Sequence, residues 1–227
     1  MKLYELTWSH YPRRVGIYIA EKGITGIERA AFDALAGWPP PEIMRLNSLG
    51  TVPVLQTDDG TLIRSSVAIL EYLEERFPMP DMIGATPETR ARTRELMSVV
   101  DEAAINFVSW CHRASPLFAG QKTQDPNAAT IAADAYYDRL RLLDRLASET
   151  AGPFLTGKDV GIADCSAIAT LQFAEQLWDV PLPSRCPALT AWYANFQRRP
   201  SVALAAYPEP LLAAARGLPG VSPPTDP

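Results

Sequence analysis

The second half of the chain carries a continuous helical pattern without strand signals. From Thr86 onward, apolar residues recur at steps of three and four, a spacing that places them along one face of a helix. Residues 162–174 are apolar nearly throughout, which is typical of a helix enclosed by its neighbours. The sequence therefore predicts an all-helical second half, with apolar stripes at Met97, Val100, Ala104, Val108 and Cys111, at Tyr136, Leu140, Leu143 and Ala147, and at Leu189, Trp192, Tyr193 and Phe196.

The first half of the chain has a different pattern, in which short apolar runs alternate with helical segments. Pro12 suits the first position of a helix because its missing N–H would have no partner there, and Gly23 suits a helix C-cap. The Asp59-Gly60 pair is typical of a tight turn between two strands. The sequence therefore predicts an α/β first half, with helices over 12–22 and 66–76 and strands over 2–6, 52–56 and 61–63.

Residues 77–85 interrupt both patterns with two prolines and a glycine, which is the composition of an interdomain connector. The last eleven residues hold four prolines and no helical pattern, so this segment adds no element to a core. We therefore expect an α/β domain over 1–80, a linker over 81–86, an all-helical domain over 87–210 and a proline-rich tail over 211–227.

Composition and charge argue against several function classes. The formal net charge of −5 does not suit a nucleic-acid binder, whose phosphate contacts require a basic surface. No run approaches the roughly 18 consecutive apolar residues of a membrane-spanning helix, and the N-terminus lacks the apolar stretch of a secretory signal. The three cysteines, Cys111, Cys165 and Cys186, have no CxxC spacing and only two histidines beside them, so we expect neither disulfides nor a metal site. The chain is therefore expected to be soluble and cytoplasmic.

Two motifs in the first half resemble the N-terminal thioredoxin-like domain of the glutathione S-transferases. They are NSLGTVPVL at 47–55 and DGTLIRSSVAILEYL at 59–73. The helical half is similar to the same family at 155–164 and at 198–202. The resemblance extends over roughly residues 1–206. It implies an α/β thioredoxin-like N-terminal domain followed by an all-α helical-bundle C-terminal domain, in a homodimer.

That resemblance implies a glutathione site that includes Val52, Pro53, Ser65 and Ser66. The Val52-Pro53 bond would be the family's cis-proline turn, which leaves the Val52 amide and carbonyl free to pair with a peptide ligand in strand fashion. Ser66 would stand at a helix N-terminus, where a hydroxyl, free amides and the positive end of the dipole suit a carboxylate. The alternative is structural: Val52-Pro53 is a fold-forming turn and Ser66 is an N-cap.

Ser9 is the candidate catalytic residue if the chain is an enzyme. Counted back from the helix end at 20–23, Ser9 falls where serine-type members of the family hold the hydroxyl that hydrogen-bonds the glutathione sulfur. Such a donor favours the thiolate, the nucleophilic form of a thiol whose ordinary pKa is about 8.5. Tyr4, His10 and Tyr11 are rival donors nearby. An apolar co-substrate pocket would be lined by Ile105, Phe107, Trp110 and Cys111.

The chain departs from the family pattern at positions that contact the ligand. The family's Glu-Ser-x-Ala-Ile motif reads SSVAI at 65–69, so Ser65 replaces the acidic residue that contacts the ligand ammonium. This removes a charge-assisted hydrogen bond of about 1.5 to 3 kcal/mol. Residues 37–41 contain no Lys or His for the glycine carboxylate of glutathione, and Arg64 would repel an ammonium. We therefore expect an eroded glutathione site. Gly161 replaces the usual Thr or Ser of a capping box, which affects the fold little.

An aromatic residue and the tail are candidate protein-binding surfaces. Trp38 precedes three prolines in a loop expected at the surface, where tryptophan is typical of binding hot spots; alternatively, it packs back over its own helix. The tail is either solvated or an extended recognition segment. With an eroded ligand site, these features resemble the transferase-like division-ring regulators of alphaproteobacteria, which bind the tubulin-like protein FtsZ. Trp38, Arg113 and Asp226 would then contact the partner.

Two functions therefore remain open. The first is a homodimeric, non-catalytic protein without a cofactor, which binds FtsZ or another cytosolic protein and regulates FtsZ filaments in cell division. It predicts no affinity for glutathione. The second is a glutathione S-transferase in which Ser9 activates the glutathione thiol toward an apolar electrophile. It predicts thermal stabilisation by glutathione, because a ligand at 100 times its dissociation constant adds about 2.7 kcal/mol.

Overall fold

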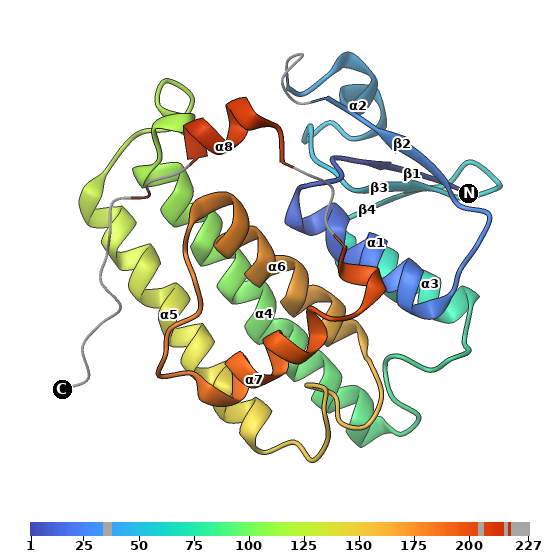
Figure 1. The fold of residues 1–227 in the computed structure, drawn as a ribbon. Coiled ribbons are helices and arrows are strands. Elements are labelled where there is room, and N and C mark those ends of the chain that lie inside the picture. The colour runs from blue at the N-terminus through green and yellow to red at the C-terminus, as the bar shows by residue number, and fades with distance from the viewer. Residues whose placement is uncertain (34–37, 204–206, 216–217, 219–227) are drawn as a thin grey trace.

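The computed structural model describes residues 1–33, 38–203, 207–215 and 218, which form a small sheet with its helices beside a larger bundle of helices (Figure 1). Within these residues the sheet has the strand order β2-β1-β3-β4. β1 pairs in parallel with β2, while the β1–β3 and β3–β4 pairs are antiparallel. The strands are β1 (Lys2–Glu5), β2 (Glu28–Ala31), β3 (Val54–Gln56) and β4 (Leu62–Arg64).

Helices cover both faces of this sheet, as a thioredoxin-like layer requires. α1 (His10–Lys22) and α3 (Ser66–Arg76) lie between the sheet and the helical bundle (Figure 1). α2 (Pro41–Leu46) lies on the opposite face, where Ile43 clusters with Tyr4 and Val54. Gly23 adopts the left-handed conformation, with φ of 68°, and ends α1, which confirms its prediction as a C-cap. β2 and α2 are short and largely exposed, so no apolar pattern in the sequence marks their bounds.

The second half contains helices and, among its described residues, no strand, which confirms the predicted all-helical half. Its predicted apolar stripes are buried, apart from the half-buried Val108 and Ala147. α6 is buried nearly all round, as its composition indicates. The elements are α4 (Pro87–Ala114), η2 (Pro116–Phe118), α5 (Pro126–Ser148), α6 (Ile162–Trp178), α7 (Pro187–Phe196), η3 (Pro200–Val202) and α8 (Glu209–Ala215).

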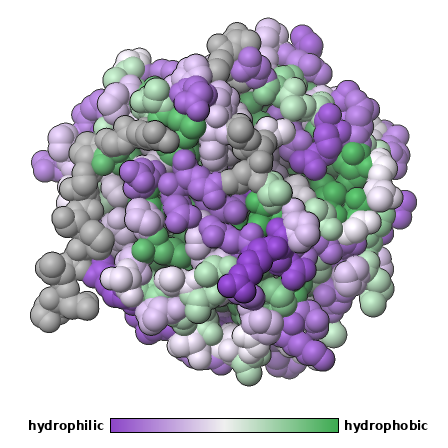
Figure 2. Space-filling model, in the orientation of Figure 1, coloured by the Kyte–Doolittle hydropathy of each residue, from purple (hydrophilic) through white to green (hydrophobic). Residues whose placement is uncertain are grey.

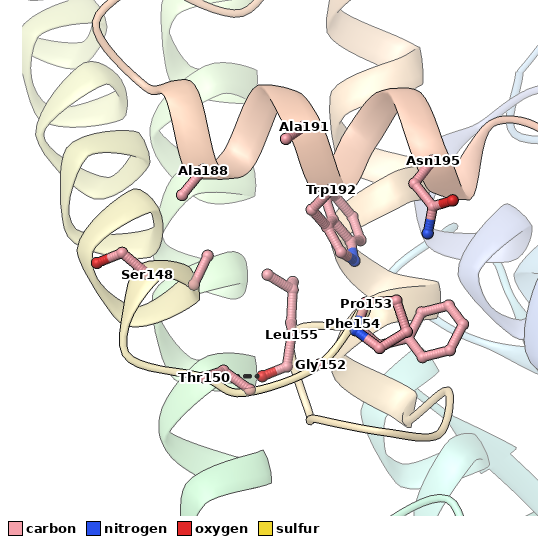
Figure 3. A pocket seen from close by; sticks show the side chains of 11 residues that line it. Ser148, Thr150, Gly152, Pro153, Phe154, Leu155, Ala188, Ala191, Trp192 and Asn195 are labelled. Carbon is pink, nitrogen blue, oxygen red and sulfur yellow. Dashed lines mark hydrogen bonds between the residues drawn. The ribbon is translucent and has the colours of Figure 1, made fainter.

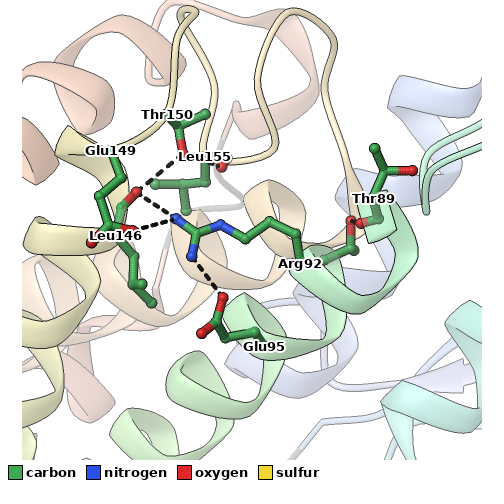
Figure 4. A network of polar contacts seen from close by, with 8 residues as sticks. Thr89, Arg92, Glu95, Leu146, Glu149, Thr150 and Leu155 are labelled. Atoms are coloured by element: carbon green, nitrogen blue, oxygen red, sulfur yellow. Dashed lines mark hydrogen bonds and ion pairs between the residues drawn. The ribbon is translucent and has the colours of Figure 1, made fainter. Parts of the chain in front are cut away.

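Polar contacts fix the long helices α4 and α5 to each other. Arg92 on α4 donates from Nη2 to the carbonyl oxygen of Leu146 at 2.8 Å and lies 3.4 Å from a carboxylate oxygen of Glu149 (Figure 4). Its Nη1 donates to Glu95 on its own helix at 2.6 Å. Arg92 therefore links the first turns of α4 to the end of α5.

A buried ionic network holds the segment between the two halves against α1 and α3. Lys22 Nζ lies 2.7 Å from Glu74 Oε2 and donates to the carbonyl oxygen of Pro80 at 2.6 Å. The Tyr18 hydroxyl donates to the same Glu74 oxygen at 2.5 Å, and the Met82 amide donates to Glu74 Oε1 at 2.9 Å. Because both charges are buried, each depends on its partner, and the segment after α3 is closely positioned.

The start of α6 explains how Gly161 is tolerated. Asp164 Oδ2 accepts the Gly161 amide at 3.0 Å and the Thr156 hydroxyl at 2.7 Å. A Cβ built on Gly161 would stand 2.6 Å from Thr156 Cγ2, so the Thr156 side chain occupies the space that an N-cap side chain would need. The remaining half of the capping box is present, and burial raises the pKa of Asp164 despite these donors.

The surface and the cysteines complete the fold. Figure 2 shows hydrophilic residues over much of one face, with apolar residues in separate patches. Cys111, Cys165 and Cys186 are buried free thiols, as expected for a chain without a disulfide framework. Across the part of the chain that the structure describes, no helix has the length and apolar character needed to cross a bilayer.

Candidate functional site

Four of the predicted ligand residues, Val52, Pro53, Ser65 and Ser66, meet at one cavity, which we call the sheet-edge cavity. Its volume is about 340 Å³. It is bounded by the start of α1, the turn before β3, the start of α3 and the middle of α4. The residues that line it are Tyr11, Arg14, Thr51, Val52, Pro53, Ser65, Ser66, Val67, Asp101 and Ile105.

The turn before β3 presents an unpaired backbone to this cavity. The Val52-Pro53 peptide bond is cis, as the resemblance implied. Within the described ranges, neither the amide nor the carbonyl of Val52 has a hydrogen-bond partner in the protein. These groups are therefore available to an extended peptide, which pairs with such backbone as an additional strand does.

The start of α3 presents two hydroxyls and a helix N-terminus. Ser65 is the N-cap residue, with φ of 91°, and its side chain makes no capping hydrogen bond. Ser66 is the first residue of α3 and is buried. The alternative interpretation of Ser66 as the N-cap is therefore wrong by one residue. Ser65 has a backbone conformation that residues other than glycine rarely adopt. Such backbone outliers are concentrated at binding sites.

Two charged residues that the sequence patterns do not identify also line the cavity. Arg14 on α1 is fully buried, and its Nη1 lies 2.5 Å from Asp101 Oδ1 on α4. Among the described residues, Nε and Nη2 of Arg14 have no hydrogen-bond partner, whereas the Asp101 side chain is 30% exposed. The cavity therefore has an acidic group and a basic group, although Ser65 is neutral and the sequence of residues 37–41 contains no Lys, Arg or His. The sequence signal that could have identified Arg14 is its positive charge beside the apolar residues of a helix that is expected to be buried.

The four candidate donors to the glutathione sulfur occupy different environments in the structure. Ser9 is the N-cap residue of α1, its hydroxyl makes no capping hydrogen bond, and it is not among the residues that line the cavity. Tyr11 does line it. His10 is buried between Tyr11 and Phe173, with ring centroids 3.9 and 4.8 Å away, and burial lowers its pKa to about 3. Tyr4 points to the other face of the sheet and donates to Gln56.

The predicted apolar co-substrate pocket does not form as expected. Only Ile105, which is 61% exposed, lines the sheet-edge cavity. Phe107, Trp110 and Cys111 lie in the hydrophobic core on the inner face of α4, and burial raises the pKa of the Cys111 thiol. The reason is helical geometry, because residues two, five and six positions beyond Ile105 do not share its face.

Two of the predicted partner-binding residues, Trp38 and Arg113, are not among the residues that line this cavity. The Trp38 side chain is 37% exposed, and its ring edge contacts Phe32 at a centroid distance of 6.5 Å. Arg113 lies in the last turn of α4 and donates from Nη1 to the Thr123 carbonyl at 3.1 Å. Asp226 lies outside the described residues. Trp38 thus combines surface exposure with a contact to its own domain.

Another hollow is lined without charged side chains. A second cavity, of about 440 Å³, lies between the end of α5, the loop at 150–155 and α7 (Figure 3). Its polar side chains are uncharged ones such as Ser148, Thr150 and Asn195. Among the described residues, no group of three or more His, Cys, Asp or Glu side chains could hold a metal ion.

Comparison with known proteins gives consistent similarities over most of the chain. The model of the glutathione S-transferase N-terminal domain matches residues 8–76, and that of the C-terminal domain matches residues 67–195. Glutathione S-transferase 2 of Saccharomyces cerevisiae is 31% identical over 213 residues, which cover 89% of this chain and 88% of that protein.

A solved structure and a cell-division protein extend these similarities. The crystal structure of Gtt2 from Saccharomyces cerevisiae has a TM-score of 0.80 and 30% identity, and the alignment covers 89% of this chain and 98% of that one. FtsZ-localized protein A of Caulobacter vibrioides is 27% identical over 208 residues, which cover 86% of this chain and 88% of that protein. The similar proteins thus include both transferases and a protein named for its localisation with FtsZ.

Proposed function

Because the chain belongs to the glutathione S-transferase family, we propose that it binds glutathione in the sheet-edge cavity and joins it through its sulfur to an apolar electrophile. The observation that carries this proposal is the convergence of three kinds of group in one cavity. They are the unpaired Val52 backbone, the N-terminus of α3 with Ser65 and Ser66, and the charged pair Arg14 and Asp101. The sequence analysis gave this function as the second of two possibilities, because the sequence does not show that Arg14 and Asp101 form a pair.

Each group suits one part of the tripeptide. The cysteine backbone of glutathione pairs with the amide and carbonyl of Val52. The γ-glutamyl carboxylate lies at the α3 N-terminus, where the helix dipole and the hydroxyls of Ser65 and Ser66 stabilise a negative charge. Asp101, which is partly exposed to the cavity, is the carboxylate available to the ligand ammonium in place of the missing acid at position 65.

The chemistry takes place near the start of α1. The first turn of this helix has no acidic residue, so its positive dipole end favours an anion there. The bound thiol loses its proton to solvent water and becomes a thiolate. The sulfur then forms a C–S bond with the electrophile, and the displaced group leaves with the electron pair of the broken bond. Val67 and Ile105 provide apolar contacts for the electrophile.

A thermal melt with several millimolar glutathione tests this function, together with turnover of 1-chloro-2,4-dinitrobenzene. We expect a saturable rise in the midpoint, since a ligand at 100 times its dissociation constant adds about 2.7 kcal/mol. The dipeptide Cys-Gly, which lacks the γ-glutamyl group, should give a smaller rise at the same concentration. Absence of both stabilisation and turnover would reject the proposal.

A second candidate function is regulation of FtsZ filaments by a cytoplasmic homodimer. Two observations favour it: the similarity to FtsZ-localized protein A and the exposure of Trp38 in the first half. An exposed tryptophan on a rigid segment is typical of interface hot spots. In this function Arg113 and Asp226 also contact the partner, and the glutathione site is not required.

Co-sedimentation with FtsZ polymers tests this second function. We expect the chain to pellet with polymerised FtsZ, and Trp38→Ala to reduce the pelleted fraction while the melting midpoint stays unchanged. Deletion of residues 217–227 examines the tail in the same assay. If the tail is a recognition segment, binding falls at constant stability; if neither binding nor stability changes, the tail has no such role. No co-sedimentation of the intact chain would remove this candidate.

A further inference from the structure

The cavity between the end of α5, the loop at 150–155 and α7, which we call the neutral cavity, lies outside the proposed transferase site. Its volume is about 440 Å³, which falls in the usual range of about 300 to 1,000 Å³ for small-molecule sites. Among the described residues, none lines both this cavity and the sheet-edge cavity. The proposed reaction of glutathione therefore leaves the neutral cavity without a role.

Two walls of the neutral cavity are held in place by local contacts. Gly152 has φ of 137°, and a Cβ built on it would stand 2.3 Å from the Gly157 carbonyl oxygen, so the loop wall has a conformation that requires glycine. On the α7 wall, Trp192 Nε1 donates to Asp164 Oδ1 at 2.8 Å, which fixes the orientation of the indole. The cavity is therefore preformed, as small-molecule sites usually are.

The lining of the neutral cavity combines aromatic surface with an uncommitted carboxamide. Ala188, Trp192 and Asn195 extend from α7 toward the loop that carries Pro153 and Phe154 (Figure 3). Within the described ranges, the side-chain amide of Asn195 forms no hydrogen bond. None of the described residues that line the cavity carries a charge. A ligand here therefore meets ring surface and one hydrogen-bonding group, without a counter-charge.

This lining suits a flat and uncharged ligand. An aromatic ring packs well against the rings of Trp192 and Phe154. A primary amide matches Asn195, because each carboxamide has both N–H donors and an oxygen acceptor. A charged group would lose its hydration without gaining an opposite charge. The Arg199 guanidinium, 5.3 Å from the Phe154 ring centroid, is already paired with Glu21 at 2.6 Å.

We propose that the neutral cavity binds an uncharged aromatic carboxamide, with its ring against Trp192 and Phe154 and its amide on Asn195. Binding is non-covalent, so no bond forms or breaks. The site goes beyond the proposed transferase function and does not depend on it, because the two cavities have separate lining residues.

Benzamide, benzoate and benzylamine are matched probes, because they share a ring and differ in the charge of its substituent. Each is titrated into the ¹⁵N-labelled full chain at neutral pH while the indole N–H signal of Trp192, assigned with Trp192→Phe, is followed by NMR. We expect benzamide to shift this signal saturably, with a dissociation constant of about 1 to 10 mM, as is usual for so small a ligand. Benzoate and the benzylammonium ion should bind about tenfold more weakly.

Two leucine substitutions on α7 locate the site. Ala191→Leu adds bulk to a residue that lines the cavity and should lower the affinity for benzamide about tenfold. Ala194→Leu is the matched control, because Ala194 is also exposed on α7 but does not line the cavity; its effect should stay below about twofold. Asn195→Ala should lower the affinity about fivefold, which corresponds to one hydrogen bond. The melting midpoint of each variant verifies that it folds.

Three outcomes would overturn the proposal. Benzoate that binds as tightly as benzamide would contradict the uncharged ligand class. Equal losses of affinity for Ala191→Leu and Ala194→Leu would contradict the location. No shift of the Trp192 signal at about 20 mM benzamide, above the expected dissociation constant, would reject the site itself. Glutathione turnover by Ala191→Leu should equal that of the unaltered protein, since the sheet-edge cavity lies elsewhere; a parallel loss of turnover would contradict the independence of the two sites.

Discussion

The two walls of the sheet-edge cavity are built in different ways. The sheet wall consists of Val52, Pro53, Ser65 and Ser66, which come from two short sequence segments joined by the β3–β4 hairpin. The helical wall consists of Tyr11 and Arg14 from α1 and of Asp101 and Ile105 from α4. The sheet wall is neutral and presents backbone and hydroxyl groups, whereas the helical wall carries the charges and the phenol.

This difference indicates a division of roles between the walls. A neutral edge with a helix N-terminus recognises the peptide backbone and a carboxylate of a ligand, in a way that depends little on side-chain identity. The helical wall depends on individual side chains, one of which is a fully buried cation. Substitutions in the helical wall should therefore alter both stability and chemistry, and substitutions in the sheet wall mainly ligand affinity.

The largest effect is expected at the charged pair. Asp101→Asn leaves the Arg14 guanidinium fully buried without its counter-charge, and Nε and Nη2 of Arg14 already have no partner in the part of the chain that the structure describes. Removing one member of a buried ion pair costs about 3 to 5 kcal/mol, and the partial exposure of Asp101 places this pair at the lower end. We therefore expect the free energy of unfolding, measured by urea denaturation, to fall by about 3 kcal/mol.

The neighbouring residue Glu102 is a matched control. It pairs with Arg139 at 2.8 Å on the exposed side of the same helix, and both side chains are substantially exposed. Because exposed pairs contribute about 0 to 1 kcal/mol, Glu102→Gln should have a small effect on the free energy of unfolding. Similar losses for the two variants would mean that the helical wall does not depend on a buried charge.

The free energy of unfolding is expected to depend on pH through His10, whose ring packs against the Tyr11 ring. Its folded-state pKa is about 3 against an ordinary value of 6.5, so between these values the unfolded chain binds more protons than the folded protein. The His10 contribution is fully present above pH 6.5 and is lost as the pH falls toward 3. At pH 5 the loss amounts to about 2 kcal/mol, at 1.36 kcal/mol per unit.

The measurement compares unfolding free energies at pH 7 and pH 5 for the unaltered protein and His10→Phe. Phenylalanine keeps an aromatic ring between Tyr11 and Phe173 but cannot bind a proton. The difference between the two proteins isolates His10 from the carboxylates that also titrate in this range. An equal loss in both proteins would show that His10 is not kept neutral by its surroundings.

The sheet wall and the helices of the second half follow from local sequence, and the charged pair of the helical wall does not. The order Val52-Pro53 and the pair Ser65-Ser66 each lie within a few residues of the element that positions them, so a motif is sufficient to place them. The stripes of α4 to α7 were likewise predictable, because burial of one helix face imposes a 3.6-residue period.

The pairing of Arg14 with Asp101 could not be predicted from a local motif, because 87 positions separate the two residues and only tertiary packing brings them together. The assignment of Phe107, Trp110 and Cys111 to a pocket was wrong for a related reason. A stripe shows that residues share a face, but not whether that face meets the core or a cavity. The apolar pattern of α4 was therefore compatible with either arrangement until the positions of α5 and α6 were known.

The smallest effect, and the one that tests the sheet wall most directly, is expected for Ser66→Ala. The Ser66 hydroxyl has no hydrogen-bond partner in the described structure, and the N-cap position belongs to Ser65, so its removal should change the free energy of unfolding by less than about 0.5 kcal/mol. If this hydroxyl binds the ligand carboxylate, glutathione affinity measured by calorimetry should fall about fivefold to tenfold, which corresponds to one hydrogen bond of about 1 kcal/mol.

Thr130→Ala is the control, because Thr130 is an exposed hydroxyl in the first turns of α5, outside the cavity, and donates only to the Pro126 carbonyl. An affinity loss confined to Ser66→Ala supports recognition by the sheet wall. A loss of stability with unchanged affinity would instead assign Ser66 a structural role, and recognition by the sheet wall would then depend on Val52 and Ser65.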